Sequence, residues 1–104
     1  MTAEPLVLVV TLEVRRTAET EFRRFETAAA EIMTSHGGRI ERVIELDAES
    51  AEILRELHIV EFPNESSFQA YRGDPRLVPL TALRHLSIIS TAILRGRNRP
   101  TYHA

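Results

Sequence analysis

The stretch from residue 57 to residue 84 constrains the fold more than any other part of this 104-residue chain. Its apolar run LHIVEF ends at Pro63, which cannot donate a hydrogen bond to a sheet ladder and therefore ends a strand. Asn64 can cap the helix that follows, and a Gly-Asp-Pro sequence at 73–75 separates that helix from a second short helical piece. This order is typical of a fold. It does not indicate a particular chemistry.

The other segments alternate between strand and helix patterns. The run at 6–14 carries apolar side chains on both faces, which predicts a central strand. Apolar residues then recur at helical spacing until a Gly-Gly stop. The predicted elements are a strand at 6–14, a helix at 19–36, strands at 39–46 and 54–62, helical pieces from 64 to about 84, and a strand at 86–94. The order β-α-β-β-α-β predicts an α+β, ferredoxin-like fold, with helices on one face of a four-stranded antiparallel sheet.

The other face of such a sheet has no helix to cover it. Alternation along the strands assigns six apolar side chains to this face, namely Val7, Val9, Leu57, Ile59, Ile89 and Ile93. At ~25 cal/mol per Å², leaving roughly several hundred Å² of apolar surface in water is too costly. Since one domain fills the chain, a second copy is the simplest cover, and we expect a homodimer that packs sheet against sheet.

Composition limits the partners and the compartment. With 13 basic and 15 acidic residues, the net charge of -2 gives no reason to expect nucleic acid or an anionic membrane as a partner. The absence of cysteine excludes disulfides and thiol catalysis, and it fits a reducing cytoplasm. The apolar run at 5–12 is too short to span a bilayer. We expect a cytoplasmic protein with one domain at 1–96 and a mobile tail at 97–104.

Several short motifs together resemble the dimeric α+β-barrel superfamily, and most closely a small bacterial family of unknown function. They are the helix end His36-Gly37-Gly38-Arg39, the strand end Val60-Glu61-Phe62-Pro63, the aromatic-bearing helix through Tyr71, Asp74-Pro75, Pro79-Leu80 and Arg84. The resemblance covers nearly everything from residue 6 to residue 96 and implies a dimeric α+β barrel. Relatives in that superfamily include small monooxygenases without cofactors, polyketide-processing enzymes, muconolactone isomerases and peroxidases. The sequence departs from its look-alikes at 47–53, which lacks a Gly- or Trp-containing turn.

Glu61 is the first candidate for proton transfer. It shares a strand face with Leu57 and Ile59, and a carboxylate held in a partly apolar cleft can work as a general acid or base. Arg39, on the neighbouring strand, could stabilise negative charge on a ligand. The alternative is an ion pair between Glu61 and an arginine.

His58 is the second candidate for proton transfer. It lies three residues from Glu61 on a strand, which places the two side chains on opposite faces and excludes a direct dyad. Its alternative role is that of a hydrogen-bonded core residue. His36, at a helix end, is expected to interact with terminal carbonyls. The four histidines, including His85 and His103, form no metal-binding spacing, so we expect no metal site.

Tyr71 and Arg84 could orient an anionic or phenolic ligand. Alternatively, Tyr71 caps the core, and Arg84 binds helix-end carbonyls or Asp74. Since Gly73 and Pro79 interrupt the helical region, it should cover the sheet incompletely and leave a gap. We expect the five candidates around this gap.

Two functions remain open. The first is a homodimeric domain that binds a small molecule or serves as an accessory, without a cofactor. The second is a cofactor-independent enzyme, similar to a monooxygenase, isomerase or cyclase, that acts on a small aromatic or polyketide-like substrate. In that case Glu61 or His58 would move a proton, and Arg39 or Arg84 would stabilise developing negative charge.

Overall fold

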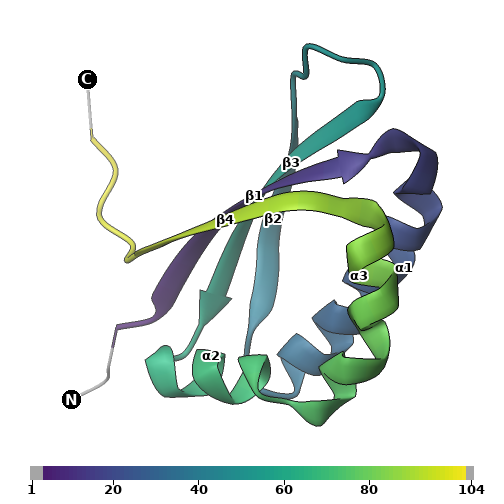
Figure 1. The fold of residues 1–104 in the computed structure, drawn as a ribbon. Helices are drawn as coiled ribbons and strands as arrows, with labels where there is room; N and C mark the ends of the chain where they lie inside the picture. Colours follow the sequence, from purple (N-terminus) through teal and green to yellow (C-terminus); the bar gives the residue numbers. More distant parts are fainter. Residues whose placement is uncertain (1–3, 103–104) are drawn as a thin grey trace.

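The computed structural model describes residues 4–102 (Figure 1). The elements follow in the order β1 (Leu6–Arg15), a 3-10 turn η1 (Arg16–Ala18), α1 (Glu19–Thr34), β2 (Arg39–Leu46), β3 (Ile53–Phe62), α2 (Glu65–Arg72), a second 3-10 segment η2 (Pro75–Leu80), α3 (Thr81–Ser87) and β4 (Ile88–Gly96). All strand pairs are antiparallel, in the order β2-β3-β1-β4. The helices lie on one side of the sheet in Figure 1. The predicted ferredoxin-like α+β architecture is confirmed.

The predicted boundary between the last helix and the last strand is wrong. Residues 86 and 87 were assigned to a strand, but they form the last turn of α3. Ser87 is buried there, and its Oγ donates to the carbonyl of Leu83 at 2.6 Å, which is a helical i to i−4 contact. The strand then continues two residues further than expected, to Gly96, so the segment expected to be a tail begins at residue 97.

The core consists of two apolar clusters on the helix side of the sheet. One contains Leu8, Met33, Val60, Phe62 and Phe68, and the other contains Leu12, Val14, Phe22, Leu54 and Ile88. Val10 lies half-buried on the same face of β1 and packs against both clusters. The core is therefore divided along β1, with its two halves at the two ends of the sheet.

A β-bulge moves part of β4 to the other face of the sheet. The register between β1 and β4 shifts after Glu13, so Ile93 lies opposite Val10 and Leu94 lies opposite Val9. Ile93 therefore faces the helices, and its predicted place on the uncovered face is wrong. An extra residue in one strand reverses the alternation beyond it, which a strict period of two cannot anticipate.

The uncovered face of the sheet carries apolar side chains, as predicted from the first and third strands, with the charged pair Arg39 and Glu61 beside them. It carries Val7, Val9, Ile44, Leu57, Ile59 and Leu94, and we call these six residues the open face. Leu94 has a relative exposure of 66%. The part of the chain that the structure describes is flat, with extents of 47 × 43 × 16 Å, because its helices all lie on one side of the sheet. Among residues 4–102, no helix is long and apolar enough to cross a membrane.

Candidate functional site

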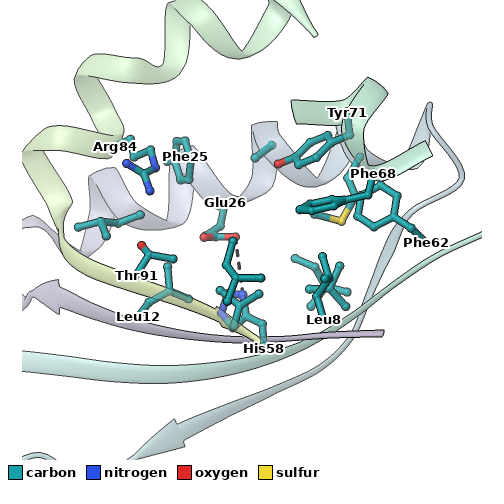
Figure 2. Close-up of a pocket in the computed structure, with 17 residues that line it drawn as sticks. Leu8, Leu12, Phe25, Glu26, His58, Phe62, Phe68, Tyr71, Arg84 and Thr91 are labelled. Carbon is teal, nitrogen blue, oxygen red and sulfur yellow. Dashed lines mark ion pairs between the residues drawn. The ribbon is translucent and has the colours of Figure 1, made fainter. Parts of the chain in front are cut away.

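A cavity of about 140 Å³ lies between the sheet and the helices (Figure 2). Most of its 17 lining residues are apolar, and they come from both core clusters. The polar side chains that line it are Glu26, His58, Tyr71, Arg84 and Thr91. These five come from α1, β3, α2, α3 and β4, so the whole fold contributes to the site.

The interrupted helical region explains why this space is not filled. The helix α2 ends at Gly73, and its aromatic residues Phe68 and Tyr71 cover one end of the cavity. The chain then passes through η2 and returns along α1 as α3, which places Arg84 and Ile88 at the other end. Val10 forms part of the floor between the two ends. The gap that was predicted beneath 64–84 is present.

Glu26 extends from α1 into the cavity above His58 (Figure 2). Burial among apolar side chains raises the pKa of this carboxyl above its usual 4.5. His58 and Arg84 oppose the rise, whereas the negative charge of Glu56 adds to it. A carboxyl group in such surroundings can hold a proton and release it to a neighbour. Glu26 is therefore the acid–base candidate that the structure adds.

Sequence reasoning missed Glu26 although the chain carries a signal for it. Phe22, Ala29 and Met33 form the buried stripe of α1. Glu26 is four residues after the first of these and three before the second, so it lies in the middle of the stripe. A carboxylate on the apolar face of a helix is unusual and marks a candidate site.

His58 lies on the floor of the cavity with a relative exposure of 4%. Its Nε2 is 2.8 Å from Oε1 of Glu56, and its Nδ1 is 3.9 Å from Oε2 of Glu26. The first distance is a hydrogen bond, and the second lies within ion-pair range (Figure 2). His58 shares its face with Val60, opposite to that of Glu61, so the exclusion of a His58–Glu61 dyad is confirmed.

Tyr71 and Arg84 lie at the two ends of the cavity in Figure 2. The Tyr71 ring packs against Phe62 with a centroid distance of 5.5 Å. Burial, with a smaller contribution from the charge of Glu26, raises the pKa of Tyr71 to about 12, so its hydroxyl stays protonated. The structure thus brings His58, Tyr71 and Arg84 together around one cavity.

Glu61 and Arg39 do not reach this cavity, and their predicted placement beside it is wrong. Arg39 pairs with Glu61 across β2 and β3, and both side chains lie on the side of the sheet away from the helices. Arg39 Nη2 is 3.2 Å from Oε1 of Glu61 and 2.8 Å from Oε1 of Glu41. Asn98 also donates to Glu61, at 3.3 Å. The alternative of an ion pair between Glu61 and an arginine is confirmed.

The other histidines lie elsewhere. His36 Nε2 is 2.8 Å from Oδ2 of Asp74, so its partner is a carboxylate and not the expected helix-end carbonyls. Hydrogen bonds from Arg76 and from His36 hold the pKa of Asp74 well below its usual value of 3.8. His85 is exposed on α3, and His103 lies outside the described residues. Within residues 4–102, no three acidic, histidine or cysteine side chains form a group that could hold a metal ion.

Solved structures of several proteins share this fold. A protein of unknown function from Rhodopseudomonas palustris is 14% identical, with a TM-score of 0.76 over 94% of this chain and 85% of its own. The cofactor-independent oxygenase SnoaB from Streptomyces nogalater is 21% identical, with a TM-score of 0.69 over 95% and 97%. An uncharacterised NIPSNAP domain protein from Burkholderia xenovorans is 12% identical, with a TM-score of 0.69 over 95% and 99%.

No family model and no curated protein matches the sequence of this chain. The structural likeness covers nearly the whole of each chain, whereas the identities are too low to carry an activity across. It confirms the resemblance that the sequence motifs indicated, at the level of the fold. The chain therefore has the same ferredoxin-like α+β fold as these proteins.

Proposed function

We propose that this protein is a cytoplasmic, homodimeric domain that binds a small, largely apolar molecule in the cavity between its sheet and its helices. The observation that carries the proposal is the convergence of five polar side chains from five elements on one apolar space. Ligand sites in proteins combine such an apolar lining with a few placed polar groups.

The size of the cavity limits the ligand. A site for a drug-sized molecule usually measures at least about 300 Å³, whereas this cavity has about 140 Å³. An apolar cavity of ~150 Å³ can hold benzene. The ligand in this conformation is therefore about one ring in size. Arg84 lies at one end of the cavity and Tyr71 at the other. Each is placed to bind an anionic or phenolic oxygen at the edge of the ligand.

The open face supports the homodimer. Apolar side chains from all four strands meet there, and described helices cover only the opposite side of the sheet. Sheet-on-sheet packing with a second copy would remove this surface from water in a closed, two-fold arrangement. The proposed ligand cavity lies on the helix side of the sheet, so a dimer formed through the open face would not cover it.

A cofactor-independent enzyme is the second candidate, and the position of Glu26 favours it. A carboxyl with a raised pKa next to a buried imidazole can exchange a proton with a ligand in the same cavity. In this version Glu26 takes the acid–base role that was first given to Glu61, with His58 as its partner and Arg84 near developing negative charge. In this conformation the cavity fits the small aromatic class of substrate, about one ring in size, and not a larger polyketide-like molecule. SnoaB, of the same fold, is a cofactor-independent oxygenase.

Binding can be tested with 4-fluorophenol followed by fluorine NMR. We expect a Kd of about 1 mM or tighter, which corresponds to about -4 kcal/mol. Ala29 is buried and lines the cavity, whereas its neighbour Ala28 lines a separate groove on α1. Ala29→Leu should therefore weaken binding at least tenfold, and Ala28→Leu should not. Equal binding by the Ala29→Leu variant and the unchanged protein would refute the cavity as the ligand site.

The enzyme candidate has its own test. In D₂O, a bound aromatic ketone such as 4-hydroxyacetophenone should exchange its α-protons for deuterium if Glu26 transfers protons. Replacing a general base typically lowers a rate by a factor of about 10² to 10⁴, so Glu26→Gln should stop the exchange while 4-fluorophenol still binds. Exchange at the rate of buffer alone, in the presence of the unchanged protein, would leave binding as the function.

A further inference from the structure

His58 separates two hollows of the protein. On one side is the cavity described above, and on the other is an open groove of about 400 Å³ between α1 and the strands β2 and β3. We call this second hollow the outer groove. It is lined by Phe22, Arg23, Glu26, Thr27, Ile40, Val43, Glu56 and His58. Glu26 and His58 line both hollows, whereas Glu56 lines the outer groove.

Three titratable side chains lie in a row between these hollows. Glu56 and His58 are two residues apart on β3 and therefore lie on the same face. Glu26 approaches the imidazole from α1. The joining distances are 2.8 Å from Glu56 Oε1 to His58 Nε2 and 3.9 Å from His58 Nδ1 to Glu26 Oε2. Relative exposures of the Glu56 and Glu26 side chains are 17% and 22%.

We propose that Glu56, His58 and Glu26 form a proton relay between the outer groove and the cavity. This inference rests on the proposed function, since a relay matters when the cavity holds a ligand that gains or loses a proton. It assigns Glu56 as a positioning residue and as the outer terminus of the path.

The hydrogen bond from His58 sets the starting state of the relay. When Glu56 is ionised it can only accept, and in the proposed starting state His58 Nε2 therefore carries the ring proton and donates to Glu56. The Nδ1 atom then presents its lone pair towards Glu26, and in the proposed starting state the Glu26 carboxyl holds the proton that it donates. A distance of 3.9 Å is too long for direct transfer, so a small rotation of the Glu26 side chain or one bridging water must close it.

The transfer conserves protons at each step. The O–H bond of Glu26 breaks as an N–H bond forms at Nδ1, and the N–H bond at Nε2 breaks as Glu56 gains the proton. Glu56 then releases that proton to water in the outer groove. Glu26 is left as a carboxylate that can accept a proton from a ligand in the cavity. If Glu26 stays ionised, the same steps in reverse restore the starting state. After Glu26 has accepted a ligand proton, His58 must instead release its Nδ1 proton to water and take one up at Nε2.

Other charged or titratable side chains face this path from the neighbouring helices and strand. They are Arg23 on α1, Glu45 on β2, Tyr71 on α2 and Arg84 on α3. Glu45 lies directly opposite Glu56 in the sheet and is well exposed. It is therefore a matched control for a change of charge beside the relay.

The relay can be tested by nitrogen NMR of the His58 ring in the full-length protein, without a ligand. We expect the ring proton on Nε2 near neutral pH. In Glu56→Gln the side-chain amide still accepts the hydrogen bond but cannot take up the proton, so exchange of the ring N–H with water should slow at least tenfold. Glu45→Gln should leave the exchange rate unchanged. A ring proton on Nδ1, or equal exchange rates in Glu56→Gln and the unchanged protein, would overturn the proposal.

A second variant tests the inner half of the path. The nitrogen signals of His58 should respond to pH over the range in which the Glu26 carboxyl titrates, and Glu26→Gln should remove that response. An unchanged response would overturn the relay. The Ala29→Leu experiment separates the two proposals, because it blocks the cavity and leaves all three relay residues in place. If the two NMR tests of His58 fail while 4-fluorophenol still binds to the unchanged protein and not to Ala29→Leu, the relay alone is refuted.

Discussion

At the scale of single residues, two glutamates show how surroundings decide chemistry. Glu61 lies near the end of the strand β3, where it forms an ion pair with Arg39 on the side of the sheet away from the helices. Glu26 lies within the apolar stripe of α1. Burial has a larger influence on its pKa than the charges of His58 and Arg84. The carboxyl that lies in the cavity is therefore on a helix.

The raised pKa of Glu26 predicts a dependence of stability on pH. The unfolded chain has the ordinary value near 4.5, so both states hold the proton below that pH. As the pH rises, the unfolded state loses its proton first, and the contribution of Glu26 to stability falls until the pH passes the folded-state pKa. In urea denaturation between about pH 5 and 8, Glu26→Gln should lose this part of the decline.

The control for this prediction is Glu31→Gln. Glu31 is exposed on the same helix, and the change removes the same formal charge. It should leave the pH dependence of unfolding as it is in the unchanged protein. Parallel curves for Glu26→Gln and Glu31→Gln would contradict the idea that burial controls the Glu26 carboxyl.

The aromatic residues of α1 are also unequal. Phe22 has a relative exposure of 2% and belongs to a core cluster, whereas Phe25 is half-buried and lines the cavity. We expect Phe22→Ala to cost about 3–5 kcal/mol in free energy of unfolding, because it leaves an unfilled space. Arg24→Ala, at an exposed position of the same helix, should cost less than about 0.5 kcal/mol in the same chemical denaturation. Comparable losses would mean that α1 is rotated about its axis.

At the scale of elements, the turn after α1 depends on two glycines. Gly37 has a φ of 76°, which favours glycine, and Gly38 is packed beneath the core. A Cβ on Gly38 would overlap the Phe62 ring and would lie 2.6 Å from Cγ of Met33. We expect Gly38→Ala to cost about 1–3 kcal/mol through overpacking. A Cβ on Gly96 meets nothing within 4 Å, so Gly96→Ala is the matched control for a thermal denaturation experiment.

The elements themselves could be predicted from the sequence, and their details could not. Alternation and helical spacing identified the strands and α1 because both periods come from local backbone geometry. The bulge in β4 changed the face of Ile93, because pairing with β1 decides where an extra residue is accommodated. Similarly, Leu86 fits a strand pattern as well as it fits the end of α3. The site was found in part. The sequence pointed to His58, Tyr71 and Arg84, but spatial proximity was needed to add Glu26.

At the scale of the whole molecule, the two sides of the sheet have different roles. The helix side contains the core and the cavity, and the open face gathers apolar side chains from every strand. On the open face Val7 is already buried at 9% exposure, whereas Leu94 is 66% exposed. A flat sheet with an apolar side that no described helix covers resembles half of a sandwich, so a partner sheet would complete a second core. The proposed dimer and the proposed ligand site are thus separable by mutation.

A charge on the open face tests the dimer directly. Val9 lies on β1, between the pairing partners Ile59 and Leu94, so Val9→Lys would place two like charges inside the proposed interface without compensation. We expect the unchanged protein to have twice the 11.8 kDa mass of one chain in light scattering at micromolar concentration, and Val9→Lys to dissociate or aggregate. Val78→Lys adds the same charge on η2, where Val78 is 70% exposed, and should leave the mass unchanged. A stable 11.8 kDa monomer of the unchanged protein would show that the open face can stay exposed to solvent, and it would refute the dimer. The ligand site would not be refuted with it, because 4-fluorophenol binding can be measured on the single chain.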